Sequence, residues 1–178
     1  MKNSKKGFTL IELLIVIALL GALAVGLLAA LDPFEQLKKG TDTGVRNTVS
    51  EVQEAIIRYY ALKNMMPWCA SADACGGVTD PSETDLSTAP MASAISNLTS
   101  TGELKADFNT LAGQTLGKIF VTGDSTNNTV SVCFKPDSKA FKCDANTKYN
   151  QNGSLHTGTT CTDAATCAST TDCYWCVE

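Results

Sequence analysis

The chain has 178 residues, of which 14 are lysine or arginine, 18 aspartate or glutamate, one histidine and eight cysteine. This length suits one compact domain with an appendage and is too short for two ordinary domains. A net charge of −4 argues against a general nucleic-acid-binding protein, because no basic excess is available to neutralise phosphates. A single histidine leaves little for histidine-dependent catalysis or a histidine-rich metal site.

The N-terminal segment has a basic start followed by a long apolar run. Three lysines stand within the first six residues, and residues 13–31 carry no charge. As a helix, this run would span roughly 28 Å, close to the ~30 Å hydrocarbon core of a bilayer. The lysines before it and the acidic Asp32 and Glu35 after it predict a cytoplasmic N-terminus. A cleaved secretory signal, with small-residue sites at 22–24 and 28–30, and a simple membrane anchor are the alternatives.

Glu12 lies at the start of the apolar run, where a carboxylate is costly. Insertion scales put the cost at about 2.5–3.5 kcal/mol deep in the bilayer and somewhat less near the interface. The sequence between Gly7 and Lys38 contains no lysine or arginine that could pair with this carboxylate. A free α-amino group, made by a cut just upstream, would supply the missing cation.

The sequence GFTLIEL at residues 7–13 is similar to the prepilin signature of type IV pilins and type II secretion pseudopilins. That signature consists of a basic leader, a glycine, a phenylalanine that becomes the mature N-terminus, and a glutamate four residues later. The resemblance implies cleavage between Gly7 and Phe8 by a membrane prepilin peptidase, followed by N-methylation of Phe8. It also implies that Glu12 pairs with the Phe8 amine of a neighbouring subunit during assembly.

A second helix is predicted after the apolar run. Asp32 can cap a helix that begins at Pro33, and a glutamate three residues after the cap completes a capping box. The sequence leaves open whether the chain breaks at Pro33 or continues as one kinked helix. Downstream, apolar residues at helical spacing predict an amphipathic helix that packs on the head's own sheet. These residues are Val45, Val49, Val52, Ile56, Tyr59 and Tyr60.

The remainder of the chain reads as a small mixed domain. Its prolines and glycines predict a loop over residues 67–90, and its polar composition after residue 143 permits no assignment. Between these segments we expect an antiparallel meander packed against the apolar stripe. The predicted elements are a helix over 89–98, a turn over 103–111, strands over 118–122, 129–134 and 140–143, and a hairpin turn over 123–128.

The predicted fold class is therefore α+β, with a long N-terminal helix on a small antiparallel sheet and a disulfide-rich C-terminal region. The pilin layout is the same, and the resemblance is specific over residues 5–31 and extends by layout alone to about residue 155. The expected parts are a leader peptide (1–7), a transmembrane and polymerisation helix (8–31), an amphipathic helix (32–63) and a globular pilin head (64–178).

All eight cysteines lie in the head, which decides the expected compartment. An even number of cysteines in a polar, loop-rich region beyond a membrane segment predicts disulfides in an oxidising space. Spacing alone does not fix the connectivity. We expect local pairing of Cys69 with Cys75, of Cys133 with Cys143, and of Cys161, Cys167, Cys173 and Cys176 among themselves.

Metal and redox sites are disfavoured. The last four cysteines contain one C-x2-C pair without a second at the spacing of zinc knuckles, and that pair lacks the βαβ setting of a redox motif. We expect no cofactor, no metal and, without a nucleophile beside a base, no enzymatic activity. The acidic residues considered for calcium do not have EF-hand spacing; they are Asp124, Asp137, Asp144 and Asp163.

The resemblance implies a structural subunit that assembles through its N-terminal helix into a type IV pilus-like filament, with copies of itself and other pilins. The further partners implied are the prepilin peptidase, an inner-membrane platform protein and a cytoplasmic assembly ATPase. The location implied is the bacterial inner membrane before assembly and a cell-surface filament afterwards, with the head extracytoplasmic.

Two alternative functions remain open. Type II secretion pseudopilins and minor pilins share the signature, although eight cysteines favour an externally exposed pilin. A membrane-anchored or secreted disulfide-rich binding module is the third hypothesis. An acidic head gives nucleic acid no evident electrostatic footing, so a DNA-binding role is disfavoured.

Overall fold

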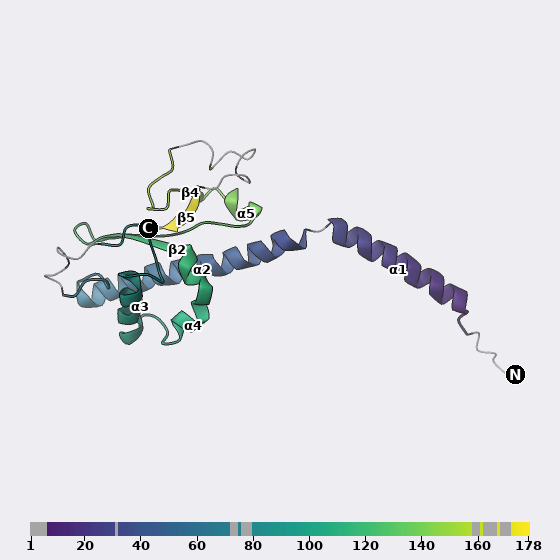
Figure 1. Ribbon diagram of the computed structural model, residues 1–178, viewed down its shortest axis with the longest axis horizontal. Coiled ribbons are helices and arrows are strands. Elements are labelled where there is room, and N and C mark those ends of the chain that lie inside the picture. Colours follow the sequence, from purple (N-terminus) through teal and green to yellow (C-terminus); the bar gives the residue numbers. More distant parts are fainter. Residues whose placement is uncertain are drawn as a thin grey trace. The chain divides into compact units, whose positions relative to one another are not determined.

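The computed structural model describes residues 7–30, 32–71, 75, 80–157, 161, 167 and 172–178. The chain divides into two compact units, Met1–Leu37 and Lys38–Glu178. The first unit holds helix α1 (Leu10–Ala30) and the first turn of α2 (Pro33–Lys63), and the second, which we call the head, holds the rest of α2 and all other elements (Figure 1).

Helices α1 and α2 have separate starts. The carboxylate of Asp32 accepts the Glu35 N–H at 3.3 Å, and the Asp32 carbonyl accepts the Gln36 N–H at 3.3 Å, as an N-cap residue does. Pro33 occupies the first helical position, where a missing N–H costs nothing. The predicted helix start is confirmed, and α2 begins there as a new helix.

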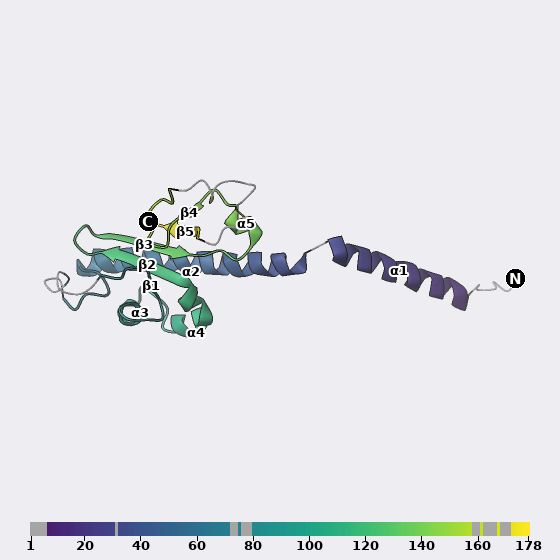
Figure 2. The ribbon, with the colours of Figure 1, turned by 45° about the horizontal axis from the view of Figure 1, so that its top comes forward.

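One face of α2 is buried in the head, as the apolar stripe predicted. The stripe residues are buried, apart from the half-buried Tyr60, and they share one hydrophobic cluster with strands β2 and β3 and helix α3. Figure 2 shows β2 and β3 running along α2. Burial of each large apolar side chain on this face contributes about 2 kcal/mol to the stability of the head.

The sheet has five antiparallel strands in the order β1-β2-β3-β5-β4. The two predicted central strands are confirmed, and they pair over their whole length from Ile119 opposite Phe134 to Asp124 opposite Thr129. The tight turn that joins them includes Asn128 at φ 56°, a left-handed conformation that asparagine tolerates. The strands are β1 (Thr84–Asp85), β2 (Ile119–Asp124), β3 (Thr129–Phe134), β4 (Thr147–Tyr149) and β5 (Tyr174–Val177).

Three short helical segments lie between strands β1 and β2. Helix α3 (Met91–Ser100) confirms the predicted helix, shifted by two residues at each end. Helix α4 (Phe108–Ala112) follows within the expected turn region and leads into the 3-10 helix η2 (Gly113–Lys118). Their apolar faces bury Met91, Leu98 and Phe108 in the same core as α2. The predicted α+β class is confirmed.

The strand predicted over residues 140–143 is wrong. These residues lie in and just after the short helix α5 (Lys139–Lys142), because Ser138 acts as its N-cap. The Ser138 hydroxyl oxygen accepts the Phe141 N–H at 3.4 Å, which closes the first turn. The sequence prediction had placed a third strand here, after Pro136 and Asp137.

The simple meander is also wrong. The strand beside β3 is β5, from the C-terminal segment that could not be assigned from sequence, and β4 lies outside it. Trp175 of β5 packs against Phe134 with ring centroids 5.7 Å apart, and Arg46 of α2 stands 4.9 Å from the Trp175 ring centroid. Contacts with residues far away in the sequence therefore hold this four-residue strand in place.

Four disulfides staple the head, and every cysteine belongs to one of them. The predicted Cys69–Cys75 disulfide is confirmed, and it closes a short loop after α2. Pairing within the last four cysteines is confirmed for Cys161 with Cys173.

The other predicted pairings are wrong. Cys133 is bonded to Cys176, not to Cys143, because β5 places Cys176 directly opposite Cys133 on β3. Cys143 follows α5 instead of lying on a strand, and it is bonded to Cys167. The C-terminal cysteines are thus tied to two different parts of the head.

Candidate assembly and processing site

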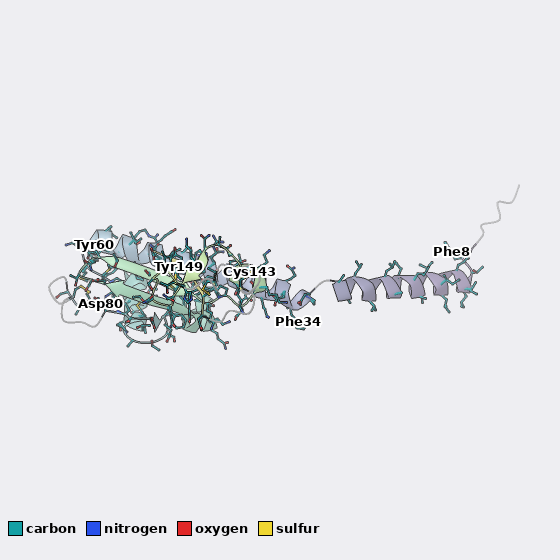
Figure 3. The ribbon with its side chains drawn as sticks, turned by 90° about the horizontal axis from the view of Figure 1, so that it is seen from above. Phe8, Phe34, Tyr60, Asp80, Cys143 and Tyr149 are labelled. Atoms are coloured by element: carbon teal, nitrogen blue, oxygen red, sulfur yellow. A yellow bond between two sulfur atoms is a disulfide. The ribbon has the colours of Figure 1, made fainter. Side chains whose placement is uncertain are left out.

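The predicted processing residues stand just before α1. Gly7, Phe8 and Thr9 are not helical, and both Gly7 and Phe8 are exposed (Figure 3). Two residues, Phe8 and Thr9, therefore separate the Gly7–Phe8 bond from the first helical residue, Leu10. The rest of the predicted leader, residues 1–6, lies outside the described residues.

Glu12 closes a capping box with Thr9. Its Oε2 accepts the Thr9 backbone N–H at 2.8 Å and the Thr9 hydroxyl at 2.7 Å, while the Thr9 hydroxyl oxygen accepts the Glu12 N–H at 3.3 Å. This arrangement satisfies backbone groups that a helix start leaves unpaired. The role of Thr9 was not predicted from sequence, although its T-x-x-E spacing to Glu12 is the ordinary signal of a capping box.

Helix α1 is apolar around its whole circumference, and its large side chains are exposed throughout the unit that contains it (Figure 3). With 21 residues it is about 31 Å long, and Leu10–Leu28 is long and apolar enough to cross a membrane by length and composition. An uncovered apolar surface of this size requires a lipid bilayer or other helices around it. The exposed residues are Leu10, Ile11, Leu13, Leu14, Ile15, Val16, Ile17, Leu19, Leu20, Leu23, Val25, Leu27 and Leu28.

One buried carboxylate in the head accepts hydrogen bonds from groups of the same chain. Asp42 of α2 is 2% exposed, and its carboxylate accepts the Ser138 N–H at 2.8 Å, the Ser138 hydroxyl at 2.6 Å and the Asp137 N–H at 3.1 Å. These hydrogen bonds fasten α2 to the start of α5. The role of Asp42 could not be predicted from sequence, because its hydrogen-bond partners lie about a hundred residues away and no local pattern marks them.

A second carboxylate fastens the segment after α2 to the β2–β3 hairpin. Asp80 accepts the Trp68 indole N–H at 2.9 Å and the Ser125 N–H and hydroxyl, both at 3.1 Å; Figure 3 labels Asp80 at this end of the head. Gly123 lies under the indole, where an added Cβ would come within 2.4 Å of the ring. This contact explains the glycine inside strand β2.

Three head residues have shifted pKa values without forming a shared site. Hydrogen bonds from the Asn127 N–H and side-chain amide and from the Thr126 N–H lower the pKa of Asp124. A hydrogen bond from the Ser87 hydroxyl, chief among several, lowers the pKa of Asp85. Burial raises the pKa of Tyr174, and nearby acidic residues add to the effect.

The residues considered for metal or redox chemistry are dispersed or already bonded. Cys173 and Cys176 belong to two different disulfides, so they form no redox pair. Asp137 forms an ion pair with Lys118 at 3.1 Å, and Asp144 accepts the Asn146 N–H at 2.8 Å. Asp163 lies outside the described residues. Within the part of the chain that the structure describes, no group of three or more potential ligands is placed to hold a metal ion.

Comparison with protein families identifies the N-terminal segment. The family model of the prokaryotic N-terminal methylation motif matches residues 2–28, which include Gly7, Phe8, Glu12 and most of α1. The chain carries the type IV pilin and pseudopilin signature. No curated protein and no solved structure matches the chain.

The signature supports a pilin-like or pseudopilin protein, and with it a structural subunit processed by prepilin peptidase and assembled with other pilins. The apolar α1 within the same matched segment fits anchoring in the membrane before assembly. The match ends within α1, so it carries no information about the head.

Proposed function

We propose that this protein is a structural subunit of a type IV pilus-like filament. The observation that carries the proposal is the exposed apolar surface of α1, most of which lies within the methylation motif. The head, in contrast, buries its own hydrophobic core. Prepilin peptidase cuts between Gly7 and Phe8, and Phe8 is then N-methylated. Leader 1–7 is lost, and helix 8–31 serves first as the membrane anchor and then as the polymerisation element.

During assembly, α1 leaves the lipid bilayer and packs against the α1 helices of other subunits. Because lipid tails are as apolar as the helices themselves, close packing rather than the hydrophobic effect drives association. Gly21 and Gly26 interrupt the large side chains of α1 and permit close approach of a second helix. The segment 32–63 and the globular part 64–178 then form the outer part of the subunit.

Glu12 fixes the register of neighbouring subunits. Only Oε2 takes part in the capping box with Thr9, so Oε1 is available to the N-terminal ammonium of Phe8 from the next subunit. In a low-dielectric filament core an unpaired charge is expensive, which penalises any register that separates the pair. The remaining partners in this scheme are the prepilin peptidase, an inner-membrane platform protein and a cytoplasmic assembly ATPase.

The location that we propose is the bacterial inner membrane before assembly and the cell surface afterwards. Four disulfides in an extracytoplasmic head favour a subunit exposed outside the cell over a periplasmic pseudopilin. A pseudopilin or minor pilin shares every feature of α1 and is the second candidate. A simple anchored binding module leaves Glu12 and the methylation motif without a role.

The test is to shear surface appendages from cells that make the protein and to label them with an antibody against the head. Wild-type chain is expected along filaments seen by electron microscopy. The control is Gly7→Leu, which places a bulky residue at the cleavage site and should leave the chain uncut in the membrane, with no labelled filaments. Heads released as single molecules, or confined to the periplasm, would contradict the pilus assignment.

A further inference from the structure

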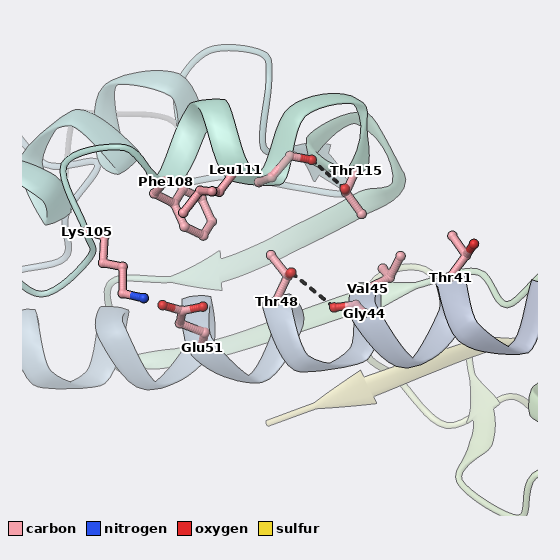
Figure 4. A pocket seen from close by; sticks show the side chains of 10 residues that line it. Thr41, Gly44, Val45, Thr48, Glu51, Lys105, Phe108, Leu111 and Thr115 are labelled. Carbon is pink, nitrogen blue, oxygen red and sulfur yellow. Dashed lines mark hydrogen bonds between the residues drawn. The ribbon is translucent and has the colours of Figure 1, made fainter.

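A groove lies in the head between α2 and the segment formed by α4 and η2 (Figure 4). Its volume is about 270 Å³, and its floor is made by the buried residues Val45, Phe108 and Ala112. The complete lining is Thr41, Gly44, Val45, Thr48, Glu51, Lys105, Phe108, Leu111, Ala112 and Thr115.

The groove is more apolar than its threonines suggest. The Thr48 hydroxyl donates to the Gly44 carbonyl at 3.1 Å, and the Thr115 hydroxyl donates to the Ala112 carbonyl (Figure 4). Because both hydroxyls donate to backbone carbonyls three or four residues earlier in the chain, they do not require a polar ligand. Leu111 on the rim is 67% exposed, although it stands beside this hollow.

Charge is confined to one end of the groove. Lys105 and Glu51 point toward one another there, from opposite walls (Figure 4). Neither forms an ion pair within 4 Å among the described residues. An occupant with an apolar body and flanking charges of both signs would therefore complement this groove.

The volume of the groove is sufficient to receive large apolar side chains. It exceeds the ~150 Å³ of an engineered cavity that holds benzene and falls below the ~300 Å³ at which small-molecule sites begin. One or two large apolar side chains would fill it.

We propose that the groove receives Phe34 and Leu37 from a second copy of this chain; this inference rests on the proposed filament function. Phe34 is 73% and Leu37 69% exposed, and their i, i+3 spacing places them on one face of α2. The pair follows the apolar α1 along the chain, so the contact would extend the polymerisation interface into the head.

The flanks of this segment match the groove. Glu35 lies beside Phe34, and Lys38 follows Leu37, so one acidic and one basic group accompany the apolar pair. They complement Lys105 and Glu51 at the charged end.

The test uses photo-crosslinking in assembled filaments. Benzoylphenylalanine replaces Leu111 on the groove rim, filaments are illuminated, and crosslinked peptides are identified by mass spectrometry. The expected product is a covalent dimer in which residue 111 is joined to a peptide containing Phe34–Leu37. Benzoylphenylalanine in place of Leu155, an exposed leucine that does not line the groove, is the matched control and should not yield this product.

A second variant checks that the apolar pair is what binds. Phe34→Ser should lower the yield of the Leu111 crosslinked dimer about tenfold, since it removes a large apolar side chain from the contact. Phe34 is exposed, so the head should fold as before, which the masses of its four disulfide-linked peptides will verify.

Filaments in which residue 111 links only to other segments, to lipid or to nothing would overturn the groove proposal and leave the filament function standing. If the unmodified chain forms no filaments, the proposed function fails, and the groove proposal fails with it.

Discussion

Helix α1 and the head contain the same types of apolar residue but differ in how far those residues are exposed. Leu20 of α1 is 59% exposed, whereas Ile56 of α2 is completely buried. Both helices are rich in apolar side chains, but α1 leaves them exposed within its own unit, whereas α2 buries one face in the core of the head. The head therefore buries its own apolar core, while the apolar surface of α1 calls for a lipid bilayer or other helices around it.

The carboxylates follow the same division. Asp42 in the head is buried, and its own chain supplies at least three hydrogen-bond donors. Glu12 in α1 is exposed, and among the described residues its carboxylate is hydrogen-bonded to Thr9 alone, the residue just before α1. Changes in the head should therefore alter stability, and changes in α1 should alter assembly without destabilising the head.

The largest expected effect comes from Glu12→Val. Processing should persist, while filament yield falls about 100-fold or more, because the Phe8 ammonium of the neighbour loses its partner in a low-dielectric core. Quantitative blotting of sheared filaments against membrane-bound chain measures this.

Glu12→Gln separates charge from capping, since glutamine can also close a capping box with Thr9. We expect it to assemble as poorly as Glu12→Val. Normal assembly of the glutamine variant would show that Glu12 serves as a cap and does not pair with the amine.

In the head, removing disulfides should cost stability in proportion to the loop that each closes. The Cys133–Cys176 pair closes a separation of 43 residues and the Cys69–Cys75 pair one of 6. On a chain-entropy account their removal as alanine pairs costs roughly 4 and roughly 2.4 kcal/mol. Denaturant unfolding should rank the variants in this order; equal costs would contradict an account based on loop closure.

Asp42→Ala should destabilise the head by about 3 kcal/mol, because it leaves the Ser138 N–H and hydroxyl and the Asp137 N–H without their acceptor. Glu54→Ala, an exposed carboxylate on the same helix, is the control and should change stability by less than about 0.5 kcal/mol. Thermal unfolding followed by circular dichroism distinguishes the two. A near-neutral Asp42→Ala would mean that the contact with α5 does not hold the head together.

The smallest expected effect is a pH dependence at the β2–β3 turn. Hydrogen bonds from Asn127 and Thr126 lower the pKa of Asp124 below its ordinary value of 3.8, so the folded state favours the ionised carboxylate. The resulting stabilisation is present above that value and is lost as the pH falls through the lower folded-state pKa. Asp124→Asn should show a shallower decline of melting temperature below about pH 4 than wild type, and an unchanged decline would refute this contribution.

Local patterns in the sequence predicted much of this molecule. The prepilin signature at residues 7–13, the start of α2 at Pro33 and the β2–β3 hairpin each depend on residues close together in the chain. The buried face of α2 was also predictable, because apolar residues at helical spacing indicate which face of a helix packs in the core.

The errors concern contacts between distant residues. Cys133 pairs with Cys176 because β5 lies beside β3, and no local signal in the polar C-terminal region marks that strand. The Asp42 contact with Ser138 spans 96 residues and likewise has no local signature. Thr9 is different, because the T-x-x-E spacing of its capping box with Glu12 is a local pattern that does predict the contact.

The most direct test of the account is the intact mass and N-terminal residue of the protein recovered from its native membrane or surface fraction. We expect a chain that begins at N-methylated Phe8 and retains four disulfides. A chain that begins near residue 25 or 31 would contradict it, because that product is a secreted head freed from an ordinary signal peptide. An uncut chain that begins at Met1 would contradict it too, since α1 would then be a plain membrane anchor.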